Sequence, residues 1–248
     1  MTAFPYTLTE DPRPCFGLVA LQVDETIEDD FRRMFPLETA RLHVTRVPSG
    51  AELTPETIAG METDLPAAAG LLPAAVCFDA IAYGCTSGTT LIGAPRVQAL
   101  IQSHARTTTV CNPLTAALAA IQALGLVRVG IVSPYIPSVA APVRAAFQAG
   151  GLTVPDMLGF GECIESRVAR ISEASLRAAT LELARRNTLD AVFLSCTNLR
   201  TLRLIPELEA LLGVPVLSSN QVLGWHMAQL AGHGSVAIPG RLASARLP

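Results

Sequence analysis

The stretch FDAIAYGCTS, from Phe78 to Ser87, has a close counterpart in LDAVFLSCTN, from Leu189 to Asn198. Both pass from an apolar residue through Asp-Ala and a short apolar run into Cys-Thr and a polar side chain, at an offset of 111 residues (189 − 78). A second pair, FGLVALQ and VGIVSPY, starts at residues 16 and 129, and two weaker matches keep the same order. Matched segments at a nearly constant offset indicate a duplicated structural unit.

Within each half, apolar runs that resemble strands alternate with Ala-, Leu- and Arg-rich segments of helical period. ASLRAATLELARRN, from Ala174, predicts an amphipathic helix. Short, wholly apolar strands between helices are typical of a parallel sheet covered on both faces. We therefore expect an α/β protein of two pseudo-symmetric, Rossmann-like domains, each with a short parallel sheet flanked by helices. Residues 1–115 plus 220–248 are expected to form the first domain, and residues 116–219 the second.

The composition excludes several classes of partner. The chain has 248 residues, half of them hydrophobic, which is enough for one substantial core or two small ones. A net charge of −3 gives no basic surface for nucleic acid, and no apolar run reaches the roughly 18 residues of a membrane span. The first residues, MTAFPYTLTEDPRP, lack the blocks of a signal peptide, so we expect a cytoplasmic protein. A homo-oligomer is compatible with all of this.

The reactive residue types narrow the chemistry. The six cysteines are widely spaced and form no CxxC pair, which favours free thiols over a metal knuckle or a redox dithiol. The sequence contains no lysine, so neither a Schiff base to pyridoxal phosphate nor a P-loop lysine is available. The four histidines show no metal-ligand spacing, and no serine-hydrolase or dinucleotide motif occurs. We therefore expect no metal and no cofactor.

Cys85 and Cys196 follow the two matched apolar runs. Ligands of parallel sheets collect at the carboxyl ends of strands, so the two thiols would meet across a cleft if the two domains face each other. Each cysteine is expected to precede a turn into a helix, whose N-terminal end would lower the thiol pKa. The alternative is that the cysteines are packing residues and the next hydroxyls are helix caps. The duplication of the pattern favours a functional pair.

Polar residues next to the cysteines are candidates for ligand binding. Thr86, Ser87, Thr197 and Asn198 supply donors that could hold a carboxylate and stabilise an enediolate. Tyr135, at the end of the strand that opens the second half, could donate to a carboxylate or be a half-buried strand-end tyrosine.

Asp24 lies in the corresponding loop of the first half, in LQVDETIEDDF. Its carboxylate suits an ammonium or hydroxyl group of a ligand, or caps the next helix. Glu25 and Thr26 compete for either role.

The paired GCTSG and SCTN, with SPY between them, resemble the aspartate/glutamate racemase superfamily. That superfamily includes cofactor-independent amino-acid racemases, hydantoin racemases, maleate cis–trans isomerases and arylmalonate decarboxylases. The resemblance covers essentially the whole chain, and QVDETIEDDFRRMFP and LSSNQVLGWHM are most similar to the maleate isomerase and ectoine-utilisation branch. It implies that Cys85 and Cys196 flank a substrate in the cleft between the domains. The carboxylate-binding residues that it implies are Thr86, Ser87, Tyr135, Thr197 and Asn198.

Two departures bear on the reaction. Arylmalonate decarboxylases keep only the second cysteine, with glycine at the first position, so Cys85 counts against a simple decarboxylase. Maleate isomerases usually carry asparagine where this chain has Asp24, and a carboxylate there would repel the second carboxylate of maleate.

The leading hypothesis is a cofactor-independent racemase or epimerase. One thiolate removes the α-proton of a small amino-acid-like carboxylate, and the opposite thiol returns a proton. The second hypothesis is a maleate-type cis–trans isomerase, in which a thiolate adds to an alkene and the adduct collapses after rotation. An arylmalonate-type decarboxylase and a non-catalytic protein that binds small molecules rank below these two.

Overall fold

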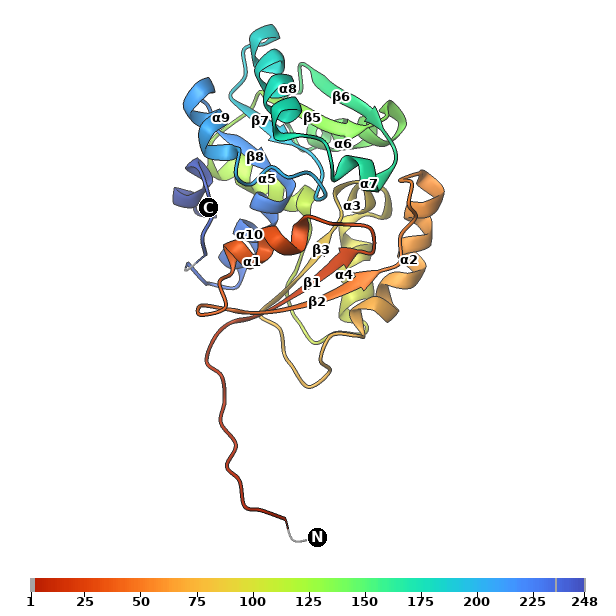
Figure 1. Cartoon of the computed structure of the whole chain (residues 1–248), viewed down its shortest axis with the longest axis vertical. Coiled ribbons are helices and arrows are strands. Elements are labelled where there is room, and N and C mark those ends of the chain that lie inside the picture. The colour runs from red at the N-terminus through yellow and green to blue at the C-terminus, as the bar shows by residue number, and fades with distance from the viewer. Residues whose placement is uncertain (1–2, 235, 248) are drawn as a thin grey trace.

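The computed structural model of the chain describes residues 3–234 and 236–247. Strands and helices alternate along almost the whole chain (Figure 1). The first half forms β1 (Cys15–Leu21), α1 (Ile27–Met34), β2 (Arg41–Val47), α2 (Pro55–Ala69), β3 (Ala80–Gly84), α3 (Thr86–Ile92), α4 (Ala94–Gln102), β4 (Val110–Cys111) and α5 (Pro113–Ala123). The second half forms β5 (Val129–Tyr135), α6 (Pro137–Ala149), β6 (Met157–Glu162), α7 (Glu165–Val168), α8 (Glu173–Arg186), β7 (Ala191–Leu194), α9 (Ile205–Leu212), β8 (Val216–Ser218), α10 (Ser219–Leu230) and a 3-10 helix (Arg241–Ser244).

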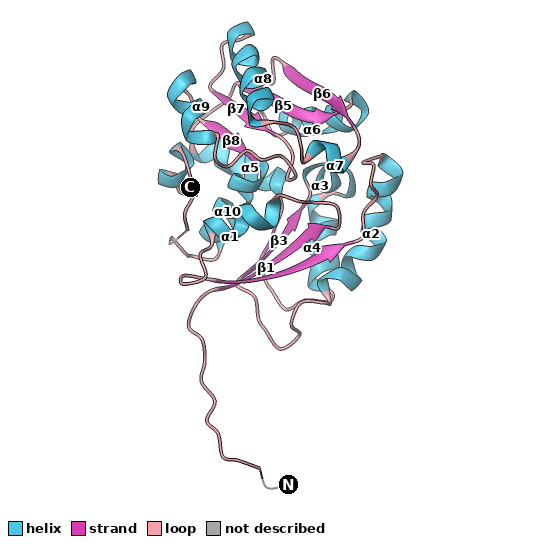
Figure 2. Cartoon of the chain, viewed as in Figure 1, coloured by secondary structure: helices cyan, strands magenta, loops and turns pink. Residues whose placement is uncertain are grey.

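The strands form two parallel four-stranded sheets of the same topology, ordered β2-β1-β3-β4 and β6-β5-β7-β8 (Figure 2). The pairing register repeats as well. Phe16 lies opposite Ala80 in the first sheet, and Val129 lies opposite Ala191 in the second. The two equivalent pairs are related by offsets of 113 (129 − 16) and 111 (191 − 80) residues, which match the sequence repeat. The predicted α/β architecture of two duplicated units is confirmed.

The central strands are buried on both faces. Every residue of β1, β3, β5 and β7 is buried, whereas the edge strands β2 and β6 are mostly half-exposed or exposed. Strands covered by helices on both faces consist of continuous apolar residues, which is why these four were recognisable from the sequence. The edge strands have no such pattern.

Side-chain caps fix the starts of several helices, among them α8 and α10. The Ser172 hydroxyl accepts the N–H of Ser175 at 3.1 Å and starts α8, which buries Leu176 and Leu183, so the predicted amphipathic helix is confirmed. Ser218 and Gln221 form a reciprocal capping box at the start of α10. That cap sets the position of the residues that follow β8.

Two hydrophobic clusters hold the fold together, and α10 packs into both. The first cluster takes in β1, β3 and the contact between the two units, and the second lies around β5, β7 and α5. Helix α10 contributes Leu223, Met227 and Ala228 to the first cluster and Val222 and Trp225 to the second. The 3-10 helix that follows adds Leu242 to the second cluster, although residues 220–248 were assigned to the first domain. The boundaries 1–115 plus 220–248 and 116–219 therefore stay a prediction.

The segment before β1 extends away from the rest of the chain (Figure 1). Phe4, Tyr6 and Leu8 on this segment are exposed. Across residues 3–234 and 236–247, none of the helices has the length and apolar character that crossing a membrane requires.

Candidate active site

Cys85 lies between the last residue of β3 and the first residue of α3. Its backbone is extended (φ −147°, ψ 114°), and its sulfur accepts the N–H of Gly88 at 3.1 Å. The sulfur therefore takes the position that a serine or aspartate oxygen takes in an ordinary helix N-cap. A side chain at Gly88 would place a Cβ 2.9 Å from this sulfur and 2.6 Å from the Tyr83 hydroxyl. Glycine at that position keeps the thiol and the tyrosine in place.

Cys196 follows β7 in the second unit. Its sulfur accepts the N–H of Asn198 at 3.2 Å and lies 3.0 Å from the hydroxyl of Tyr135. The turn into a helix expected after this cysteine is present: residues 197–204 form turns and irregular backbone, and α9 begins at Ile205. The expectation that the N-terminus of this helix lies at the thiol was wrong, because LRTLRL forms turns before the helical segment IPELEALL. Cys196 keeps one backbone donor but has no helix N-terminus behind it.

The ends of β3 and β7 are hydrogen-bonded to each other. The Thr197 hydroxyl donates to the carbonyl of Gly84 at 3.2 Å. The Thr86 hydroxyl lies 2.9 Å from the hydroxyl of Ser219, which accepts the N–H of Cys196 at 3.1 Å. The structure thus brings the two Cys-Thr segments together at the junction of the units, as the sequence predicted. Ser87 is buried in the first turn of α3, next to Thr86.

Glu165, the first residue of α7, is a member of this cluster that the sequence interpretation missed. Its carboxylate accepts the Tyr135 hydroxyl proton at 2.6 Å and the side-chain amide of Asn198 at 2.8 Å. The residue is 1 % exposed, and burial raises the pKa of its carboxyl; in its ionised form it raises the pKa of both Cys85 and Cys196. Glu165 could have been predicted as a site residue because it is a polar residue just beyond the end of a strand. That signal was hidden because β6 is an edge strand without an apolar run.

Asp24 caps the next helix, which is one of the two roles considered for it. Its Oδ1 accepts the N–H groups of Thr26 and Ile27, each at 2.8 Å, and so caps the start of α1. Its Oδ2 is buried and has no hydrogen-bond partner. Burial raises the pKa of the Asp24 carboxyl, and the two backbone N–H groups, the Thr197 side chain and the charge of Arg46 act in the opposite direction. One oxygen therefore caps a helix, and the other is an unused acceptor.

The loop after Asp24 is bonded to the second unit. The Thr26 hydroxyl donates to the carbonyl of Asn198 at 3.1 Å, and the N–H of Glu25 donates to the Asn198 side-chain oxygen at 2.9 Å. Asn198 is therefore held from both units, and its side-chain amide donates to the carboxylate of Glu165 at 2.8 Å and to the carbonyl of Val23 at 3.5 Å.

Both thiols are neutral in this structure. Cys85 and Cys196 are each 3 % exposed. Burial raises the pKa of Cys85 to about 12 and that of Cys196 well above its usual range, and the Glu165 carboxylate adds to both effects. The N–H donors of Gly88 and Asn198 oppose the shift but do not outweigh it. The expected lowering of the thiol pKa was therefore wrong, because desolvation exceeds the effect of one N–H donor.

Ser219 and Asn220 form a supporting layer behind Cys196. The Asn220 amide donates to the carbonyl of Thr197 at 2.8 Å and to the carboxylate of Asp30 at 2.9 Å. Burial raises the pKa of Asp30 to about 6. The sequence interpretation missed these residues, although the polar run that follows the apolar VPVL was a usable signal.

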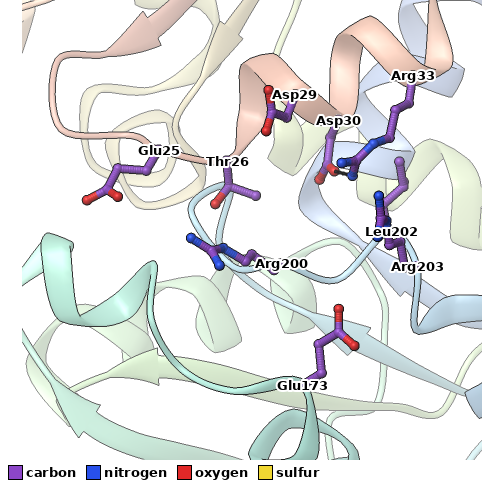
Figure 3. Close-up of a pocket in the computed structure, with 9 residues that line it drawn as sticks. All are labelled: Glu25, Thr26, Asp29, Asp30, Arg33, Glu173, Arg200, Leu202 and Arg203. Atoms are coloured by element: carbon purple, nitrogen blue, oxygen red, sulfur yellow. Dashed lines mark hydrogen bonds and ion pairs between the residues drawn. The ribbon is translucent and has the colours of Figure 1, made fainter.

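Tyr135 lines a surface pocket of about 380 Å³, and two further surface pockets border the cluster. One, of about 350 Å³, is lined by charged side chains of both units (Figure 3). Thr26, which bonds to Asn198, belongs to its wall. The other, of about 230 Å³, is lined by Gln22, Val23, Glu25, Ala51, Glu165 and Ser166. Glu165 is thus the residue of the cluster that meets this second pocket.

Within residues 3–234 and 236–247, the cysteines are free thiols, and no group of three His, Cys, Asp or Glu side chains is placed to hold a metal ion.

Two duplicated α/β units, with a Cys-Thr pair at the carboxyl end of each matched strand, define the class as the aspartate/glutamate racemase superfamily. A family profile narrows this assignment. The profile of the arylmalonate decarboxylase family matches residues 51–243, and the chain belongs to that family.

Individual relatives agree with this assignment. The arylmalonate decarboxylase of Bordetella bronchiseptica is 36% identical over 129 residues, which is 51% of this chain and 53% of that protein. The chain thus spans about half the length of the curated relative it matches.

Among solved structures, the maleate isomerase Iso of Pseudomonas putida S16 has a TM-score of 0.82 and 21% identity, over 93% of this chain and 98% of that one. A cysteine-to-serine mutant of Nocardia farcinica maleate cis–trans isomerase, with a covalently bound succinylcysteine intermediate, has a TM-score of 0.77 and 21% identity over 93% and 98%. A double mutant of arylmalonate decarboxylase has a TM-score of 0.76 and 26% identity over 92% and 98%. The two maleate isomerases establish the shared fold.

Proposed function

We propose that this protein is a cofactor-independent racemase or epimerase that acts at the α-carbon of a small amino-acid-like carboxylate. The observation that supports it is the equivalence of the two thiols. Cys85 and Cys196 follow equivalent strands, each sulfur accepts one backbone N–H, and each has a tyrosine hydroxyl nearby. Racemisation needs a base on one face of the substrate and an acid on the other, with the roles exchanged in the reverse direction. Two similar thiols meet that requirement.

The reaction proceeds by proton transfer alone. The thiolate of one cysteine takes the α-proton, and the electron pair left on the carbon delocalises into the carboxylate as an enediolate. The thiol of the other cysteine then delivers its proton to the opposite face, which inverts the centre and exchanges the two protonation states. The buried hydroxyls of Thr86 and Ser87 would donate to the enediolate, whereas the Thr197 hydroxyl already donates its proton to the carbonyl of Gly84.

The raised thiol pKa values fit a substrate that carries a positive charge. Burial is the main cause of both shifts, and the carboxylates of Asp24 and Glu165 raise both pKa values further. A substrate ammonium beside these carboxylates would offset their field and lower the pKa of the thiol that acts as base. The base would then form when substrate binds.

Proton exchange in D2O tests this proposal. Loss of the Cα–H signal is followed by NMR for both enantiomers of a panel of amino acids and N-acyl amino acids, together with optical rotation. We expect exchange and loss of optical activity with the natural sequence, and loss of racemisation in Cys85→Ala and in Cys196→Ala. Full exchange and turnover in both variants would contradict the two-thiol mechanism.

Family membership supports a second candidate, decarboxylation of an arylmalonate-type diacid. In that reaction Cys196 would protonate the carbanion left after CO2 departs, and Cys85 would have no role in proton transfer. Release of CO2 from phenylmalonate that survives Cys85→Ala and fails in Cys196→Ala would select this candidate. Conversion of maleate to fumarate, with a substrate-mass adduct on one cysteine, would instead select covalent cis–trans isomerisation.

A further inference from the structure

Two buried carboxylates beside the thiols have no basic partner. Asp24 is 3 % exposed and Glu165 is 1 % exposed. Neither takes part in any ion pair of the described residues. Arg46 approaches this region, but its guanidinium donates to the backbone carbonyl of Asp24 at 2.8 Å and not to the carboxylate. Buried acids without a countercharge are costly to folding, so their presence beside two nucleophilic side chains calls for a ligand that uses them.

Glu165 occupies the two donors that an anionic substrate group next to Cys196 would need. The Tyr135 hydroxyl and the Asn198 amide both point at its carboxylate, at 2.6 and 2.8 Å. The other polar atom of the Asn198 side chain is engaged by the N–H of Glu25. A carboxylate that belongs to the protein therefore already satisfies the anion donors on the Cys196 side.

Backbone bonds hold Glu165 in this place. Residues 51–53 and 163–165 form a two-stranded strap that joins the two units. The N–H of Glu165 donates to the carbonyl of Ala51 at 3.0 Å, and the N–H of Leu53 donates to the carbonyl of Cys163 at 3.1 Å. An antiparallel bridge between Glu52 and Ile164 lies between these two bonds. The backbone of Glu165 is thus fixed from both units, and its side chain is held by the Tyr135 hydroxyl and the Asn198 amide.

The Cys85 side presents neutral donors. Thr86 and Ser87 follow Cys85 directly and are both buried, and the Thr86 hydroxyl is bonded to the neutral hydroxyl of Ser219. The cluster therefore combines neutral hydroxyls with two buried acids that have no ion-pair partner. A ligand that matches it has one carboxylate and, on its other side, a group that donates hydrogen bonds.

We propose that Glu165, together with Asp24, is a specificity-determining residue that excludes dicarboxylates and admits monocarboxylates that carry an ammonium group. A second carboxylate bound by the Tyr135 and Asn198 donors would lie directly beside the Glu165 carboxylate, and the two like charges would repel each other. An ammonium in that position would instead pair with Glu165 and with the free oxygen of Asp24. The proposal rests on the proposed function for the chemistry at the α-carbon, but ligand selectivity is measured independently of turnover.

Isothermal titration calorimetry of the full chain tests the selectivity. The probes are malonate, succinate and maleate as dicarboxylates, and D- and L-alanine as ammonium monocarboxylates. Glu165→Ala frees both donors, and Glu165→Gln removes the charge at nearly the same volume. Glu207→Gln is the matched control, because Glu207 is an exposed glutamate of the same unit that pairs with Arg177. Thermal melting of each variant verifies folding, and Glu165→Gln carries the test if Glu165→Ala does not fold.

We expect dicarboxylate affinity to rise by about tenfold or more in both Glu165 variants, alanine affinity to fall, and Glu207→Gln to match the natural sequence. The proposal is overturned if the natural sequence binds dicarboxylates as tightly as the folded Glu165 variants do. Its failure is distinguishable from that of the proposed function. If the Glu165 variants gain dicarboxylate binding but no amino acid shows Cα exchange, the selectivity proposal is supported and the racemase proposal is rejected. If Cα exchange is seen without that gain in binding, the racemase proposal is supported and the selectivity proposal is rejected.

Discussion

The hydroxyl of Tyr135 lies 3.0 Å from the sulfur of Cys196 and donates its proton to Glu165 at 2.6 Å. A tyrosine hydroxyl has a single proton, so its oxygen can only accept in its contact with the sulfur. Cys196 must therefore be the donor, which agrees with the raised pKa of its thiol. Thiol, phenol and carboxylate form a chain through which the protonation state of Cys196 depends on Glu165.

Tyr135→Phe breaks that chain and keeps the ring. We expect kcat for racemisation to fall by about 10- to 100-fold, because both Cys196 and Glu165 lose their shared partner, with a smaller change in KM. Steady-state kinetics in both directions measures the two constants. Tyr83→Phe is the matched comparison on the Cys85 side, and equal kcat values for the natural sequence and Tyr135→Phe would remove Tyr135 from the mechanism.

A comparison of Asp24→Asn with Asp24→Ala distinguishes the helix-capping role of Asp24 from the role of its negative charge. Asparagine keeps a side-chain oxygen that can accept the N–H groups of Thr26 and Ile27, whereas alanine removes it. We expect Asp24→Ala to be less stable than Asp24→Asn by about 1 kcal/mol in urea unfolding. Both variants should lose affinity for ammonium-bearing ligands to a similar degree. If Asp24→Asn binds alanine as well as the natural sequence does, the free oxygen of Asp24 has no role in the ligand site.

The duplication was readable from the sequence because matched strands at the centre of a sheet are continuous apolar runs with a fixed ending. The fold and the equivalent strands could therefore be predicted from two matched segments, Phe78–Ser87 and Leu189–Asn198. The same match predicted that the Cys-Thr ends of these strands lie together. Glu165 was out of reach because it follows an edge strand whose half-exposed residues have no clear period.

The protonation state of the thiols was equally out of reach. It depends on burial by both units, which no local segment specifies.

The raised thiol pKa values predict alkaline activation. Only the thiolate removes a proton, and below the thiol pKa its population rises tenfold per pH unit, so the rate at subsaturating substrate should increase with pH through the neutral range. Titration of thiolate ultraviolet absorbance checks the cause: Cys85 should ionise only at strongly alkaline pH in the free protein, as judged by the difference from Cys85→Ala. Ionisation of Cys85 near neutral pH in the free protein would show that burial does not control this thiol.

His226 and Asp30 predict opposite effects of acid on stability. Burial lowers the pKa of His226 from 6.5 to about 4, so its neutral form favours the folded state. That stability is present above pH 6.5 and is lost as the pH falls toward 4, and it amounts to about 3 kcal/mol. Burial raises the pKa of Asp30 from 3.8 to about 6, so folding instead gains about 3 kcal/mol as the pH falls from 6 to 3.8.

The effects of His226 and Asp30 on the pH dependence of stability are opposite and nearly equal, so they nearly cancel in the natural sequence. Substitution of one of the two residues should make the effect of the other measurable. We expect His226→Gln to become more stable relative to the natural sequence as the pH is lowered from 6.5 to 4, and Asp30→Asn to become less stable relative to it over pH 6 to 4. Urea unfolding at half-unit pH steps, with Glu207→Gln as the control, measures both differences. Parallel stability curves for His226→Gln and the natural sequence would mean that the unpartnered Nδ1 of His226 is reached by solvent and that its side chain titrates normally.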